Sequence, residues 1–364
     1  MPLNCGIVGL PNVGKSTIFN ALTASKAPAA NYPFCTIDPN VGIVPVPDAR
    51  MDRIVTMVKP HSIVPTTMEF VDIAGIVEGA SKGEGLGNQF LANIREVDAV
   101  VHVLRCFEDD DITHVENKID PIADAETVET ELMLADLDSL EKRVKPLEKK
   151  ANSGEKEAKE ALALMTKALV LLREGKPARV AELAAEERGP YSQLGLMTAK
   201  PVLYVLNVEE ASAAGGNAIS AKAEAMAKSQ GARSVVISAK IEEEIAQMPN
   251  KDRKDFLDSL GLEEPGLNRL IRAGYDLLGL ITFFTAGPKE ARAWTVTRGS
   301  KAPQAAGVIH TDFEHGFIRA ETVAYPDYVA GKGEAGAREA GKFRLEGKDY
   351  IVADGDVMHF RFNT

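Results

Sequence analysis

Nine residues near the N-terminus have the types and spacing that hold a phosphate. Residues 9–17 read Gly-Leu-Pro-Asn-Val-Gly-Lys-Ser-Thr and fit the pattern G-x-x-x-x-G-K-[ST]. In such a loop, backbone N–H groups surround the β-phosphate, Lys15 reaches the β- and γ-oxygens, and the Ser16 hydroxyl is a ligand for Mg²⁺. The pattern therefore predicts a nucleoside triphosphate site with these nucleotide-binding residues: Asn12, Val13, Gly14, Lys15, Ser16 and Thr17.

The flanking sequence predicts the strand and the helix that such a loop requires. Residues 5–8 form a short apolar, β-branched run, and residues 17–23 carry apolar side chains at helical spacing. The start of that helix would add its own partial positive charge to the phosphate site. A glycine-rich turn that binds nothing is the alternative, and the Lys-Ser pair disfavours it.

Two later segments predict the remaining phosphate and metal contacts. Thr36 lies in an irregular loop after the first helix, where a second Mg²⁺ ligand is expected. Asp72 follows a predicted strand at 67–71 and is placed to hold Mg²⁺ through water, while Gly75 can offer its N–H to the γ-phosphate. The ordered set predicts a switch-type NTPase, with Lys15 and Gly75 acting on the γ-phosphate. The predicted metal ligands are Ser16, Thr36 and Asp72.

The residues expected to select the base follow a later strand. Residues 207–210, Asn-Val-Glu-Glu, stand where GTPases carry N-K-x-D. Glu210 is one methylene longer than the aspartate that binds guanine, and Val208 replaces the lysine that stacks on the base. We therefore predict ATP over GTP, with Asn207 and backbone groups reading adenine. An exposed polar strand end is the alternative. A base-supporting S-A-K element follows the next predicted strand, at Ser238, Ala239 and Lys240.

The order of predicted elements divides the chain. Strands alternate with helices up to about residue 125, which predicts a parallel sheet covered on both faces. Apolar residues at steps of four and three over 133–147 and 158–172, with a turn at 152–154, predict an antiparallel helical hairpin with coiled-coil seams. Pro146 should kink its first arm. Packing between the two arms explains the apolar stripes most simply, and a partner-binding groove is the alternative.

The sheet is predicted to resume at 201–206 and 234–237, and a helix at 267–278 closes the domain. From residue 281 the pattern changes to short strands separated by turns, with a short helix near 302–311. The expected strands are 281–285, 292–297, 317–323, 350–352 and 357–362. We predict a nucleotide-binding domain at 1–125 and 200–279, a helical insertion at 126–199 and a mostly β domain at 280–364.

Composition limits the class of protein. A chain of 364 residues is too long for one compact core, and 45% apolar residues is ordinary for a soluble protein. The net charge of −11 argues against a general nucleic-acid coat. No apolar run approaches a membrane span, and the first strand leaves no room for a signal peptide. Three widely spaced cysteines suggest neither a disulfide framework nor a zinc site, so we expect a cytoplasmic protein.

These motifs resemble those of the YchF/Obg-like ATPases, a family of translation-factor P-loop NTPases, and the resemblance runs from end to end. It rests on residues 9–17, on Pro-Phe-Cys-Thr-Ile at 33–37, on Asp-Ile-Ala-Gly at 72–75 and on N-x-x-E at 207–210. The resemblance implies an α/β P-loop domain with the helical hairpin inserted and a C-terminal TGS domain, which is a β-grasp module. It also implies a monomer that hydrolyses ATP to ADP. The implied partners are the ribosome, both its large subunit and the 70S particle, and the ribosomal RNA. The cleft between the three domains would be a plausible RNA-binding surface.

Three residues bear on the rate of hydrolysis. In Ras-like enzymes a glutamine directly after D-x-x-G orients the attacking water, and Ile76 stands at that position here. The resemblance points to His114 as the catalytic replacement, with a solvated loop histidine as the alternative. Related NTPases with asparagine at the position of Asn12 can bind K⁺, which would place a fixed charge between the phosphates.

Two rival hypotheses for the whole protein remain open: an ordinary GTPase, and a binding module that nucleotide merely stabilises.

Overall fold

The computed structural model describes residues 3–24, 40–73, 86–109 and 119–363, which fall into two compact units. The first unit comprises the described parts of 1–43 and 69–274, and the second comprises 44–68 and the described part of 275–364. Residues 44–68 therefore belong with the C-terminal residues, whereas the sequence analysis assigned them to the nucleotide-binding domain. The first unit also includes the predicted helical insertion.

The first unit is built on a six-stranded sheet in the order β2-β4-β1-β5-β6-β7. Strand β1 pairs in parallel with β4 and β5, and β6 pairs in parallel with β5 and β7. The predicted parallel arrangement is therefore confirmed for β4, β1, β5, β6 and β7. The strands of the sheet are β1 (Asn4–Val8), β2 (Val41–Pro45), β4 (Thr67–Asp72), β5 (Ala99–Arg105), β6 (Val202–Asn207) and β7 (Arg233–Ile237).

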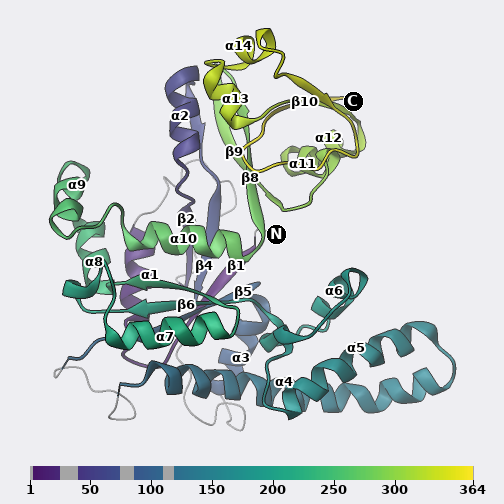
Figure 1. Cartoon of the computed structure of the whole chain (residues 1–364). Helices are drawn as coiled ribbons and strands as arrows, with labels where there is room; N and C mark the ends of the chain where they lie inside the picture. The colour runs from purple at the N-terminus through teal and green to yellow at the C-terminus, as the bar shows by residue number, and fades with distance from the viewer. Residues whose placement is uncertain (1–2, 25–39, 74–85, 110–118, 364) are drawn as a thin grey trace. The chain divides into compact units, whose positions relative to one another are not determined.

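Helices cover both faces of this sheet, and their starts follow local sequence signals (Figure 1). Asn217 accepts hydrogen bonds from the N–H groups of Ile219 and Ser220 and caps α7, while Asp120 caps α4, whose first residue is Pro121. Figure 1 shows α1 and α10 on one face and α4 and α7 on the other. The bounds are α1 (Lys15–Ala24), α3 (Leu86–Glu96), α4 (Pro121–Asn152), α7 (Ala218–Ser229), α8 (Ala239–Gln247), α9 (Asn250–Ser259) and α10 (Gly266–Leu277).

Helix α4 continues beyond the sheet and packs against α5 (Lys156–Arg173). Their shared core contains most of the predicted apolar stripe, including Leu140, Met165 and Leu169. Packing between the arms thus accounts for these positions. The chain returns to the sheet through two short 3₁₀ helices, η2 (Ala178–Val180) and η3 (Met197–Ala199), on either side of α6 (Ala185–Ser192). Helix α4 runs through Pro146 to residue 152.

The second unit is a mixed six-stranded sheet in the order β11-β10-β12-β8-β9-β3. Neighbouring residues of β8 point to opposite faces, so Phe283 joins the core under α11 and α12 while Phe284 joins the core under α2, α13 and α14. The strands are β3 (Ser62–Val64), β8 (Leu280–Ala286), β9 (Glu290–Thr297), β10 (Phe317–Val323), β11 (Arg344–Glu346) and β12 (Val357–Phe362). The helices are α2 (Ala49–Val58), α11 (Ala302–Ile309), α12 (Thr311–His315), α13 (Tyr325–Ala330) and α14 (Glu334–Glu339).

Two local expectations for this unit need correction. The predicted strand at 350–352 is only an isolated antiparallel bridge between Ile351 and Lys301. No strand forms there because a turn precedes Ile351 and only this one residue pairs with another segment. Strands β3 and β11 were not predicted, since three residues are too few to show an alternating pattern. Among the described residues, no helix is long and apolar enough to cross a membrane.

Candidate functional site: a nucleotide pocket

The phosphate loop lies between β1 and α1, as the sequence predicts. Two of its residues adopt left-handed backbone conformations, Asn12 with φ of 64° and Gly14 with φ of 93°. Gly14 is required for a second reason, because a Cβ there would collide with the side-chain nitrogen of Asn207. Its carbonyl accepts the N–H of Ile18 at 3.0 Å, so the loop passes directly into the first turn of the helix.

The structure brings together the phosphate-loop lysine and the aspartate of D-x-x-G. Lys15 Nζ forms an ion pair with Asp72 Oδ1, and the two side chains are 11% and 21% exposed. This contact follows from topology, since β1 and β4 are parallel neighbours with Ile7 opposite Asp72. The N–H of Asp72 donates to the Asn40 carbonyl at 2.8 Å, which fixes the end of β4.

The donor set near Lys15 suits a magnesium ion. Ser16 is exposed in the first turn of α1, and the Asp72 carboxylate lies against the lysine beside it. Hydroxyl and carboxylate oxygens, completed by phosphate and water, are the ligands that Mg²⁺ prefers. Within the described residues, no group of three or more His, Cys, Asp or Glu side chains is placed to hold a metal ion.

Asn207 holds two loops together. Its Nδ2 donates to the carbonyl of Val13 at 2.9 Å, and its Oδ1 accepts the N–H of Ala239 at 2.9 Å. The residue is buried, and it stands at the end of β6 opposite Arg105 of β5. This side chain was predicted to read adenine. The structure gives it a holding role, which leaves its second Nδ2 hydrogen and a second lone pair on Oδ1 for a base, and the reading of adenine stays a prediction.

A cavity of about 450 Å³ joins the phosphate loop to the predicted base-selecting residues. Asn12, Gly14 and Thr17 line one side of it. Val208 is 2% exposed and is fixed by the bond from its N–H to the Ile237 carbonyl at 2.9 Å. The other predicted lining residues are Asn207, Glu210, Ser238, Ala239 and Lys240, and the remaining ones are Phe107, Glu108, Asp109, Glu209 and Glu243. Residues far apart in sequence thus surround one space of nucleoside size.

Two of the residues that line this cavity, Lys240 and Glu210, form an ion pair. Lys240 Nζ lies 2.5 Å from Glu210 Oε1, and this hydrogen bond lowers the pKa of Glu210 and raises the pKa of Lys240. The Ser238 hydroxyl, in contrast, is buried and has no hydrogen-bond partner within the part of the chain that the structure describes. Buried polar groups are normally satisfied, so this hydroxyl is an exception among the residues that line the cavity.

The sequence analysis missed one wall of the cavity, the segment 107–109 that follows β5. Phe107 is half-buried there, and the guanidinium carbon of Arg105 lies 4.7 Å from its ring centroid. An aromatic residue two positions beyond a buried strand was the available signal. Four other residues of interest, Thr36, Gly75, Ile76 and His114, lie outside the described residues.

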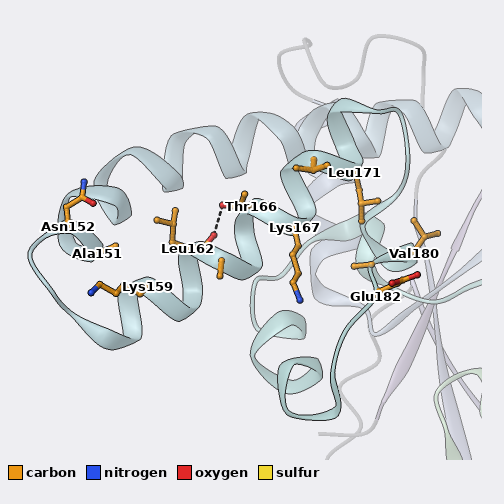
Figure 2. Close-up of a pocket in the computed structure, with 12 residues that line it drawn as sticks. Ala151, Asn152, Lys159, Leu162, Thr166, Lys167, Leu171, Val180 and Glu182 are labelled. Carbon is orange, nitrogen blue, oxygen red and sulfur yellow. Dashed lines mark hydrogen bonds between the residues drawn. The ribbon is translucent and has the colours of Figure 1, made fainter.

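A larger cavity, of about 940 Å³, lies along α5 and η2, and it contains none of the predicted nucleotide-binding residues. Figure 2 shows Leu162, Leu171 and Val180 among its lining residues. The Thr166 hydroxyl donates to the Leu162 carbonyl at 2.8 Å, within its own helix, and Lys167 pairs with Glu187 at 2.7 Å. This mostly apolar groove does not suit a triphosphate. The alternative of a partner-binding groove stays a prediction.

Comparison with known proteins identifies the family. The chain is 59% identical over 364 residues to a "Ribosome-binding ATPase YchF" from Haemophilus ducreyi, and the match covers all of both chains. The chain belongs to the YchF family. Its Bacillus subtilis relative of the same name is 56% identical over 366 residues, again with full coverage of both chains.

Family models and a solved structure agree with this assignment. The model for the YchF GTPase C-terminal region, described as a protein of unknown function, matches residues 280–363, and the model described as a 50S ribosome-binding GTPase matches residues 4–136. The solved structure of the Schizosaccharomyces pombe YchF GTPase is 40% identical in sequence to this chain and superimposes on it with a TM-score of 0.89. The match covers 99% of this chain and 97% of that one. The names of these YchF proteins differ on the base, since two say ATPase and the structure says GTPase.

Proposed function

We propose that this protein is a ribosome-binding ATPase. It hydrolyses ATP to ADP and phosphate, and the bound nucleotide sets its conformation in translation or its regulation. The observation that carries the proposal is the 450 Å³ cavity, which joins the phosphate loop to a carboxylate already paired with Lys240. Ribosome binding rests on the full-length YchF relatives that carry that name. The protein would act in the cytoplasm as a monomer.

The ion pair at the cavity wall supports adenine over guanine. A carboxylate that selects guanine must accept two hydrogen bonds, from the ring N1–H and from the 2-amino group. Glu210 is longer than the usual aspartate, and its Oε1 already accepts from Lys240. Adenine lacks the 2-amino group and carries no hydrogen on N1, so it does not need this carboxylate as an acceptor. The Ser238 hydroxyl and nearby backbone groups are then the polar partners for the base.

Magnesium would be held by Ser16, Asp72 and Thr36, and K⁺ would be a second ion near Asn12. When bound, the metal supplies positive charge to the β- and γ-phosphates. Lys15 adds its own charge at the γ-phosphate, and the adjacent Asp72 carboxylate keeps this lysine at the loop. Contacts from Thr36 and Gly75 to the γ-phosphate would order two loops that hydrolysis releases.

The two further regions have proposed identities as well. We assign the helices at 126–199 as the inserted hairpin of the family and residues 280–364 as its TGS β-grasp domain. The support is the packing of α4 on α5 and the order of β8, β9, α11, β10 and β12 in a mixed sheet. The ribosome and its RNA would be the macromolecular partners of these regions.

Competition binding tests the nucleotide, and co-sedimentation with purified ribosomes tests the partner. ATP should displace a fluorescent nucleotide at lower concentration than GTP, and ribosomes should retain the protein in an ATP-dependent manner. A preference for GTP would favour an Obg-type GTPase. Turnover that stays at its basal rate when ribosomes are added would favour a binding module that nucleotide merely stabilises.

His114 is the proposed replacement for the missing water-orienting glutamine, since Ile76 cannot orient a water molecule. The variant His114→Ala should slow ribosome-stimulated turnover by about a hundredfold or more, the usual contribution of a positioned acid–base group, and leave ATP affinity unchanged. Single-turnover hydrolysis measures the first and equilibrium binding the second. Unchanged turnover would remove His114 from the catalytic set.

A further inference from the structure

Arg105 lies buried behind one wall of the nucleotide cavity and contacts that wall at both ends. It is the last residue of β5 and is 1% exposed. Its Nε donates to the Phe107 carbonyl at 3.2 Å, and its Nη2 donates to the Asp109 carbonyl at 3.3 Å. The same guanidinium lies 4.7 Å from the centroid of the Phe107 ring. Arg105 itself does not line the cavity.

The wall depends on side chains for its conformation. Phe107 is half-buried, Glu108 and Asp109 are exposed, and the segment follows the end of β5 without joining the sheet. A second side chain fastens its start, because Asn217 Nδ2 donates to the Cys106 carbonyl at 2.6 Å and to Glu209 Oε2 at 2.8 Å. Arg105 supplies the contacts at the wall itself, and a planar guanidinium can serve two carbonyls and a ring face together.

We propose that Arg105 is a positioning residue for the nucleotide base. It holds the Phe107 ring at the cavity wall, where the ring contacts the base, and it acts through that ring without touching the nucleotide. The inference rests on the proposed function, since it takes the cavity to bind a purine nucleotide. The phosphate grip comes from the separate loop between β1 and α1, so base binding and phosphate binding should respond differently to a change at Arg105.

The variant Arg105→Lys tests this separation in the full chain. Lysine keeps the positive charge but has no fork to serve both carbonyls. The wall then loses one charge-assisted hydrogen bond that holds Phe107 in place, so the dissociation constant for ATP should rise about tenfold. The dissociation constant for inorganic tripolyphosphate should stay unchanged. Arg179→Lys is the matched control. Arg179 is another largely buried arginine, paired with Glu129 at 2.7 Å, and it does not line the cavity, so both affinities should hold.

A double-mutant cycle shows whether Arg105 acts through the ring. Phe107→Ala should weaken ATP binding by itself. In that background, adding Arg105→Lys should change the ATP affinity by less than about twofold, because the group it positions is gone. A purely structural role for Arg105 would instead give independent, additive effects and would weaken tripolyphosphate binding as well.

Three results would overturn the inference: unchanged ATP affinity in Arg105→Lys, parallel loss of ATP and tripolyphosphate affinity, or full additivity with Phe107→Ala. If Arg105→Lys does not fold, Arg105→Gln replaces it, since glutamine keeps one donor for the wall. A wild-type protein that binds GTP and not ATP would contradict the proposed function alone. The same cycle measured with GTP would then still decide the role of Arg105.

Discussion

At the scale of single residues, the site depends on side chains that bind backbone groups of other loops. Asn207 ties the phosphate loop to the segment after β7, and Arg105 and Asn217 fasten the segment after β5. Side chains with fixed amide or guanidinium geometry suit this work, because each can satisfy backbone groups from more than one loop. The pocket is therefore shaped by residues that need not touch the nucleotide.

Shortening Glu210 should change the preference for the base. In Glu210→Asp the carboxylate withdraws from Lys240 and regains the length that accepts both guanine hydrogens. The affinity for GTP relative to ATP should rise about tenfold or more, because one hydrogen bond to a charged group is worth about 1.5–3 kcal/mol. Competition binding measures this ratio. Glu243→Asp makes the same change elsewhere on the cavity wall and should leave the ratio alone, and an equal ratio in both variants would contradict the role given to Glu210.

A buried histidine should make the protein sensitive to mild acid. Burial, together with the nearby Arg179 charge, lowers the pKa of His102 from 6.5 to about 3, and its Nε2 has no hydrogen-bond partner among the described residues. Between pH 6.5 and pH 3 the unfolded chain therefore binds a proton that the folded chain does not. The free energy of unfolding should fall as pH drops through this window, by about 1.4 kcal/mol per pH unit from this group.

Urea unfolding at several pH values measures this effect in wild type and in His102→Leu. Other groups titrate in both proteins, so the difference between the two pH profiles isolates the histidine. The variant should lose less stability between pH 6.5 and pH 4.5. Parallel profiles would show that His102 does not remain neutral in the folded protein.

At the scale of elements, the helices beyond the sheet are anchored to the nucleotide-binding unit by polar side chains that bind backbone groups. Asp136 of α4 accepts the N–H groups of Met197 and Thr198 at 3.0 and 2.8 Å, at the start of η3. Two residues later, Lys200 Nζ donates to the Ile94 and Arg95 carbonyls, each at 2.7 Å, at the C-terminal end of α3. These contacts connect α4, through η3 and Lys200, with the C-terminal end of α3.

Removing the Asp136 carboxylate should be costly. Asp136→Ala leaves two backbone N–H groups and the Thr198 hydroxyl without their acceptor in a buried place, which should lower the free energy of unfolding by about 2–4 kcal/mol. Chemical denaturation gives the value. Asp138→Ala, two residues on, breaks only an exposed pair with Lys142 and should cost less than about 0.5 kcal/mol. Similar losses in both variants would rule out a special role for the buried contact.

At the scale of the whole molecule, the two units combine distant parts of the chain. Strand β3 pairs with β9, and α2 packs beside β8 and β9, so residues 44–68 complete the C-terminal unit. Nothing local in that segment marks this placement. From the sequence alone, its short strand and amphipathic helix could equally belong to the first unit. Only the pairing of β3 with β9, more than two hundred positions later, assigns the segment to the second unit.

The sequence by itself determined the phosphate loop, the parallel order of strands and helices, and the positions of the residues that follow each strand. These properties depend on local spacing, and local spacing is visible in a sequence. The tertiary structure decided which loops meet, that Glu210 pairs with Lys240, that Asn207 holds two loops, and that residues 107–109 form a wall supported by Arg105. Such contacts depend on side-chain packing between strand ends, which only the folded chain brings together.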